Sequence, residues 1–157
     1  MKITDYLIAQ HAVFLRMLDF VRKLQARDPV REVHGLKELV LAIAAVLEEH
    51  AKIEEEILLK ALKPLLETRQ DIFKTLSYED RIIQSMIKAV VSAEDPDKLH
   101  AEISLFVVFF RDHMQKEEKE IFPLAERKLG EARLKELGQL IPNHFEEASA
   151  PRRSDVS

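Results

Sequence analysis

The sequence predicts an all-α fold, an up-down-up-down four-helix bundle with a short fifth helix at its C-terminal end. Apolar residues recur every three or four positions through most of the 157 residues, which is the periodicity of helices and not of strands. Only three glycines and six prolines interrupt this pattern, so the helices should be long and their connections short. Long helices with short connections pack as antiparallel neighbours.

The first helix should begin at Thr4, with Asp5 behind it, because threonine is a common N-cap residue. It should end near Asp28 and Pro29. Its inward face carries Leu7, His11, Phe14, Leu18 and Val21.

The second helix should run from about Val30 to Lys63, where Pro64 stops or bends it. Two polar residues, His50 and Glu54, interrupt its apolar face. The complete inward series is Leu36, Val40, Ile43, Leu47, His50, Glu54, Ile57 and Ala61.

The third helix should occupy Asp71 to Ser92, with Asp80 in an otherwise apolar series. Asp95 and Pro96 are typical of an N-cap and a first helical turn, so they should open a fourth helix that Pro123 kinks or ends. The inward series of this fourth helix is Leu99, Phe106, Phe109, Phe110, His113, Glu117 and Ile121. The apolar run 105–110 would also suit a strand, but it lies inside a helical pattern with no turn residues nearby.

A short fifth helix is expected from Ala132 to Leu137, between Gly130 and Gly138. We therefore expect one domain over residues 1–138 and a loose polar tail over 139–157.

Composition excludes several classes of function. The net charge of −4 and the pI of about 5.9 leave no basic surface for nucleic acid or for an anionic membrane. No window approaches a membrane span, so a cytoplasmic location is the default expectation. The absence of cysteine excludes disulfides, thiolate metal sites and a cysteine nucleophile, so any metal must be held by nitrogen and oxygen. The sequence does not identify a protein partner.

A repeated motif carries the chemistry. His50 precedes Glu54 by four residues and His113 precedes Glu117 by four, so each pair lies on one helical face. The copies are 63 positions apart, and in both the first glutamate is followed by a second and then by an apolar pair. The spacing alone is a weak signal, because it also occurs at His34, which we expect on the surface with His100 and His144.

Antiparallel packing would bring these motifs to one level of the bundle, together with His11 and Asp80. The series Leu76, Asp80, Ile83, Ile87, Val90 matches Leu7, His11, Phe14, Leu18, Val21 position for position. This match favours Asp80 over its neighbour Glu79 as the contribution of the third helix. The resulting candidate site consists of His11, His50, Glu54, Asp80, His113 and Glu117.

A metal is the simplest reason to bury such a set, because ionised carboxylates inside a helical core are unfavourable unless they are paired, protonated or coordinated. Imidazole and carboxylate ligands suit iron, manganese or zinc, and two carboxylates able to bridge suit a pair of ions. The alternatives are a helix-surface hydrogen bond in each motif, a solvated Asp80, and Glu118 in place of Glu117. Phe106, Phe109 and Phe110 would keep the space near the ions apolar, which suits a small gas.

These residues resemble the hemerythrin-like, or HHE cation-binding, family over about residues 1–138. The resemblance lies in His11 with its surrounding segment, in His50 to Glu54, and in His113 to Glu117 with the Phe-Pro-Leu-Ala-Glu that follows. It implies two iron ions, with His11 and His50 on one, His113 on the other, and Glu54 and Glu117 bridging both. Manganese or zinc are the alternative metals.

The sequence departs from this family in the third helix, which usually supplies at least one histidine. Here no histidine occurs from Ser77 through Leu99, and Asp80 is the expected replacement. An anion in place of a neutral imidazole favours the ferric state over reversible oxygen carriage.

The resemblance thus implies a non-haem di-iron protein that handles dioxygen, peroxide or nitric oxide in sensing, carriage or detoxification. The alternatives are a carboxylate-rich oxidase or peroxidase, a metal-stabilised structural or regulatory bundle, and a metal-free bundle that binds a partner.

Overall fold

The protein is described by a computed structural model over residues 1–27, 32–66, 68 and 70–141. The described residues form helices and no strand, as predicted, and the run 105–110 is helical. The predicted tail lies outside these ranges beyond residue 141. None of the helices within them combines the length and apolar character that a membrane crossing needs.

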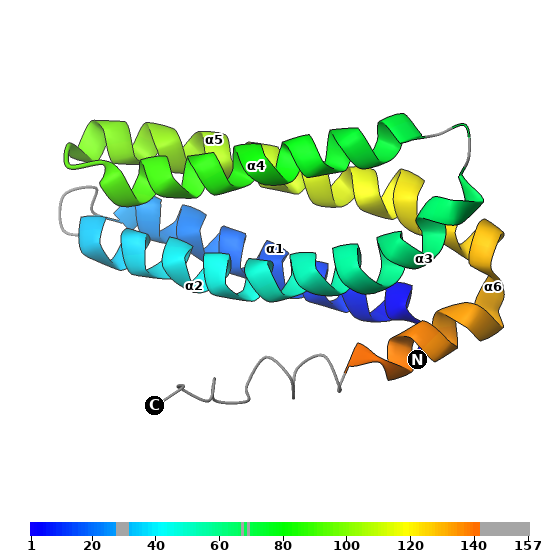
Figure 1. The fold of residues 1–157 in the computed structure, drawn as a ribbon. Helices are drawn as coiled ribbons and strands as arrows, with labels where there is room; N and C mark the ends of the chain where they lie inside the picture. The colour runs from blue at the N-terminus through cyan, green and yellow to red at the C-terminus, as the bar shows by residue number, and fades with distance from the viewer. Residues whose placement is uncertain (28–31, 67, 69, 142–157) are drawn as a thin grey trace, which may run out of the picture.

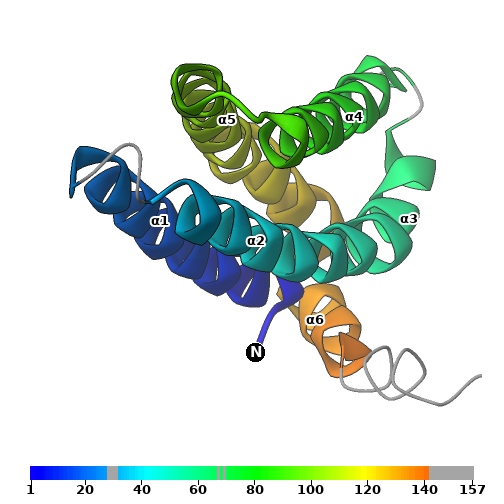
Figure 2. The same ribbon diagram turned by 90° about the vertical axis from the view of Figure 1, so that its left-hand side faces the viewer.

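Four long helices make up the body of the molecule: α1 (Ile3–Arg27), α2 (Val33–Ile53), α4 (Gln70–Ser92) and α5 (Pro96–Lys116). Figure 1 shows the chain running along α1, returning along α2, and repeating this path with α4 and α5. In Figure 2 α1 and α2 form one layer and α4 and α5 the other. Helix α1 contacts α2 and α5, and α4 contacts α5 and α2, so the apolar faces of all four helices meet in the middle.

Two of these helices continue into a wider turn. The π-helix η1 (Glu54–Leu59) follows α2 and leads through α3 (Lys60–Leu62) to the 3₁₀-helix η2 (Lys63–Leu65). The π-helix η3 (Glu117–Ile121) follows α5 and leads into α6 (Phe122–Gln139). Both π-helices begin at the glutamate of the repeated motif. A π-turn contains one residue more than an α-turn and often occurs at functional sites.

The extra residue changes which side chains of the following helix face the core. After η1 the inward positions are Leu58 and Leu62, which are fully buried, whereas Ala61 is only half-buried. The prediction that Ala61 points inward was therefore wrong, because it assumed an uninterrupted α-helix. After η3 the same rotation buries Phe122 and Ala125.

The helix boundaries correct one predicted cap and agree with another. Thr4 lies inside α1, fully buried, and its hydroxyl donates to Glu126 Oε1 at 3.3 Å, so it is not the N-cap. The carboxylate of Asp5 instead accepts from the backbone N–H of Lys2 at 3.3 Å. At α5 the prediction is confirmed, since Asp95 Oδ2 accepts from the Lys98 N–H at 2.9 Å.

The segment after Pro123 differs from the expected short helix. The chain stays helical through Pro123, because proline fits the first turn of a helix, and Gly130 then breaks the segment with a φ of 75°. The second part runs past Gly138 to Gln139. Gly138 passes so close to the Met1 carbonyl that a Cβ there would collide with it, and α6 packs on α1 at this point.

Candidate metal centre

Nearly all the buried polar groups belong to one cluster. Apart from Thr4, every polar or charged side chain that is buried among the described residues lies in the middle of the bundle. The five members of the cluster are His11 from α1, His50 from α2, Glu54 at the start of η1, His113 from α5 and Glu117 at the start of η3. Each is at most 5% exposed.

Glu117 lies between two groups of imidazoles. Its Oε2 atom is 3.0 Å from Nε2 of His11 and 3.9 Å from Nε2 of His50. Its Oε1 atom is 2.7 Å from Nε2 of His113. The possible ligand atoms of His11, His50 and Glu117 all lie within 4.8 Å of one another, which is compact enough for one metal ion.

The other two predicted residues lie beside this arrangement. Glu54 Oε2 is 4.0 Å from Nε2 of His50. Asp80 Oδ1 is 3.4 Å from Nε2 of His113, and the Asp80 side chain is 45% exposed, so it forms the solvent-facing edge of the centre. All six predicted residues thus come together, five of them buried. His34, by contrast, has a side chain that is 90% exposed, as expected.

A second layer of residues holds the imidazoles in place. Each ring contacts an acceptor through its Nδ1 atom at 2.8 to 2.9 Å, in the pairs His11 with Glu118 Oε1, His50 with Gln10 Oε1, and His113 with Glu79 Oε2. Gln10 presents its oxygen to the ring because its amide nitrogen donates to the Tyr6 hydroxyl at 3.4 Å. Lys116 forms an ion pair with Glu79. These contacts put the ring protons on Nδ1 and turn the Nε2 lone pairs inward, which is how ligand histidines are usually oriented.

Sequence reasoning treated this layer only in part. Glu79 and Glu118 were considered as alternative ligands, whereas both contact the outer side of a histidine. Gln10 and Tyr6 were not considered. The only signal in the sequence is that Gln10 directly precedes His11, and its contact with His50 depends on how α1 and α2 pack.

Burial and mutual repulsion act on the carboxylates in different ways. Burial, and then the charges of Glu117 and Asp80, raise the pKa of Glu54 well above its ordinary value. Burial acts in the same direction on Glu117, but its contacts with the three imidazoles outweigh it and hold the pKa of Glu117 well below the usual range. For Asp80, burial raises the pKa to about 6 despite the opposing charge of His113.

The imidazoles also differ from one another. Burial lowers the pKa of His50, since its outer partner is a neutral amide. Burial would lower the pKa of His113 as well, but its bonds to Glu117 and Glu79 raise that pKa to about 9. Without a metal, His113 is therefore the ring that carries a positive charge at neutral pH.

The cluster contains polar atoms that a cation would satisfy. Glu54 Oε1 is enclosed and has no hydrogen-bond partner among the described residues, and the two enclosed oxygens of Glu117 face Nε2 of His11 at 3.0 Å and Nε2 of His113 at 2.7 Å. The Nε2 atoms of His11 and His50 are 3.3 Å apart, with their lone pairs facing inward. Unpaired groups of this kind are costly inside a protein. The donor set contains nitrogen and oxygen only, so it fits iron, manganese or zinc.

Aromatic rings enclose the cluster on its buried sides. Phe122 stacks on His11 with ring centroids 5.5 Å apart, and Phe14 meets His50 edge-on at the same distance. Phe110 in turn packs against Phe14 at 5.2 Å. Phe106 and Phe110 are buried as expected, whereas Phe109 is only partly buried.

The fold and the cluster together define a helical-bundle protein with a buried site suited to a cation. Residues 2–125 match the family model of the hemerythrin HHE cation-binding domain. Since this match covers most of the 157 residues, the chain belongs to that family, as its motifs predicted. Searches of curated proteins and of solved structures gave no match.

Proposed function

We propose that this protein is a non-haem di-iron protein that handles a small oxidant such as dioxygen, peroxide or nitric oxide. The observation that carries the proposal is the position of Glu117, whose two oxygens face different histidines at 3.0 and 2.7 Å. A carboxylate in this position is suited to bridging two ions. The enclosed Glu54 Oε1 atom, which has no hydrogen-bond partner among the described residues, supports the same conclusion.

The distances favour one assignment of ligands. His11 and His50 would hold the first ion with Glu117 Oε2, since these atoms form the tightest group. His113 and Asp80 would hold the second ion with Glu117 Oε1. Glu54 would be the second bridging carboxylate, which agrees with its unpartnered Oε1 and with a pKa raised first by burial and then by Glu117 and Asp80.

An iron pair held by these residues would supply reducing electrons and coordination positions for the small oxidant. The protein supplies the surroundings. Phe14, Phe110 and Phe122 exclude water from the buried side, so an uncharged ligand would be favoured there. Asp80 and the carboxylates behind His11 and His113 would stabilise the higher oxidation state of bound iron. These features favour detoxification, sensing or oxidase chemistry over reversible carriage.

Metal analysis followed by a redox test examines the proposal. The purified chain should contain about two iron ions, in line with bridged carboxylate sites. The anaerobic ferrous protein should develop a near-ultraviolet charge-transfer absorption when air or peroxide is added. Continued consumption of peroxide with a reductant would select a peroxidase. A single zinc ion without a redox response would contradict the proposal and indicate a metal-stabilised structural bundle.

The matched control is the double variant His50→Ala with Glu54→Ala. It should lose both the metal and the absorption while remaining helical by circular dichroism. If neither protein contains metal and the double variant is as stable as the unchanged chain, the di-iron proposal would be wrong. The remaining interpretation would be a metal-free bundle that binds a partner.

A further inference from the structure

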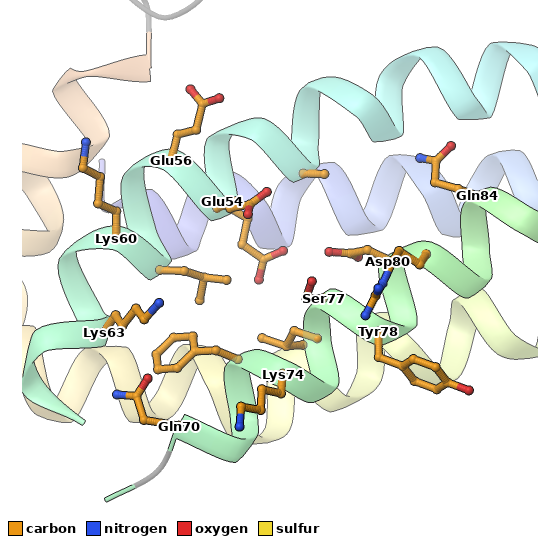
Figure 3. Close-up of a pocket in the computed structure, with 16 residues that line it drawn as sticks. Glu54, Glu56, Lys60, Lys63, Gln70, Lys74, Ser77, Tyr78, Asp80 and Gln84 are labelled. Carbon is orange, nitrogen blue, oxygen red and sulfur yellow. The ribbon is translucent and has the colours of Figure 1, made fainter. Parts of the chain in front are cut away.

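A cleft of about 1180 Å³ opens between the α2–α3 side of the bundle and α4. Figure 3 shows its two walls, with Glu54, Lys60 and Lys63 on one and Lys74, Ser77 and Asp80 on the other. Glu54 and Asp80 are the two members of the candidate metal centre that line it. The cleft therefore borders the candidate metal centre on its solvent side.

The cleft contains both acidic and basic side chains. Glu54 and Asp80 lie at the metal centre, whereas Lys63, Lys74 and Gln70 lie at the other end of the cleft (Figure 3). Lys74 precedes Asp80 by six residues on α4, so the two residues are separated by about 9 Å along the helix.

Within the described part of the chain, the basic side chains that line the cleft form no ion pair or hydrogen bond. These side chains are Lys60, Lys63, Lys74 and Arg81. Elsewhere on the surface, Lys52 pairs with Glu48 at 3.0 Å and Lys135 pairs with Glu131. The lysine end of the cleft is thus available to an anion supplied from outside.

The cleft also has an apolar lining, formed by Leu59, Phe73 and Leu76. In the chain, Leu59 lies between Glu54 and Lys63, and Leu76 lies between Lys74 and Asp80. A bare inorganic anion would leave this surface in water. A ligand with an apolar body would cover it and gain from the burial.

We propose that the cleft binds a small organic anion, with its carboxylate at Lys63 and Lys74 and its aliphatic body over Phe73, pointing toward Asp80. This inference goes beyond the proposed di-iron chemistry and does not depend on it, because the lysines and the apolar surface are present without any metal. With a loaded centre, the free end of the ligand would lie beside the ions.

Calorimetric titration of the full-length, metal-free chain tests the proposal. Hexanoate is the probe, and 1-hexanol, hexylamine and inorganic phosphate are the comparisons. Hexanoate should bind at one site per chain and at least about tenfold more tightly than the other three, because a charge-assisted bond to a lysine and burial of the chain are both needed. Equal binding of hexanol, hexylamine or phosphate would overturn the proposal, as would the absence of saturable binding.

Matched variants locate the site. Lys63→Gln with Lys74→Gln should weaken hexanoate binding about tenfold or more. Lys88→Gln removes an exposed charge from the same helix outside the cleft and should leave binding unchanged. Equal loss in both proteins would overturn the proposal, since it would show a general effect of charge. The two single variants provide the same comparison if the double variant does not fold.

A separate measurement of iron content shows whether the cleft proposal and the di-iron proposal fail independently. Iron binding without hexanoate binding overturns only the cleft proposal. Hexanoate binding to a chain that takes up no iron supports the cleft proposal and contradicts the di-iron function.

Discussion

The Nε2 atoms of His11 and His50 lie 3.3 Å apart in the core, and neither ring is free to turn away. The Nδ1 atoms of the two rings are held by Glu118 and Gln10. Two inward lone pairs at this distance repel each other unless a cation or a proton lies between them. A bound cation between the two rings would remove this repulsion.

Metal removal should lower the melting temperature. An ion present at 100 times its dissociation constant stabilises the folded state by about 2.7 kcal/mol. For a chain of this size that corresponds to roughly 5–10 °C. Thermal unfolding followed by circular dichroism, with and without a chelator, measures the change. The double variant His50→Ala with Glu54→Ala should show no effect of the chelator. Identical melting of the unchanged chain in both conditions would contradict a metal site.

Glu117→Gln should abolish the binding of both ions, because Glu117 is the residue that faces both groups of histidines. Iron per chain should fall from about two to well below one, as expected for loss of a shared bridging ligand. Glu120→Gln removes an exposed carboxylate three residues later and should retain the full iron content. Retention of two irons by the Glu117 variant would exclude it as a bridge.

Asp80 and Glu79 should respond differently, since they contact opposite sides of the His113 ring. Asp80→Ala should reduce the iron content by about one ion, because it removes a ligand of the second site. Glu79→Gln should keep both ions but bind the second one about 10–100-fold more weakly, the usual effect of losing an outer partner. Iron titration with a competing chelator separates the two outcomes. The reverse pattern would make Glu79 the ligand.

The metal-free protein should lose stability as the pH rises from about 6.5 to about 9. Burial opposes the charge of His113, but Glu117 and Glu79 raise its pKa from 6.5 to about 9. A histidine with a raised pKa contributes stability that is complete below its unfolded value and is lost as the pH passes the folded value. Urea unfolding at several pH values measures the slope. His113→Gln should flatten it, and an equal slope in both proteins would refute this assignment.

Deleting Glu55 should spare the fold. A π-turn is an α-helix with one residue inserted, so the deletion restores an α-helix and keeps Leu58 and Leu62 facing inward. Deleting Glu48, in the regular part of α2, instead rotates the inward residues on one side of it out of register. We expect cooperative unfolding in the first variant and loss of folded protein in the second. Comparable loss in both would show that the π-turn is needed for folding.

The sequence predicted much of the fold and of the cluster, because helical periodicity is a local property. A polar residue at an inward position, such as His50 or Glu117, is visible without knowing its neighbours. The contact of Gln10 with His50 could not be predicted in this way, since it depends on the spacing between α1 and α2. The π-turns were missed although the sequence contains a trace of them, namely the shift of apolar residues from the phase of Ile57 to that of Leu58 and Leu62.

The assignment of Thr4 failed for a similar reason. Threonine near the start of a helix usually caps it, but here its hydroxyl finds a partner on a distant helix, Glu126 of α6. A local rule was overridden by tertiary packing.

In the gene, each π-helix corresponds to one codon more than a regular α-helix at the same place would need. Losing a codon at either place would turn the π-helix back into a regular helix and keep the apolar residues that follow it facing inward. The surroundings of Glu54 and Glu117 can thus be altered by the smallest in-frame insertion or deletion, without redesigning the hydrophobic interior.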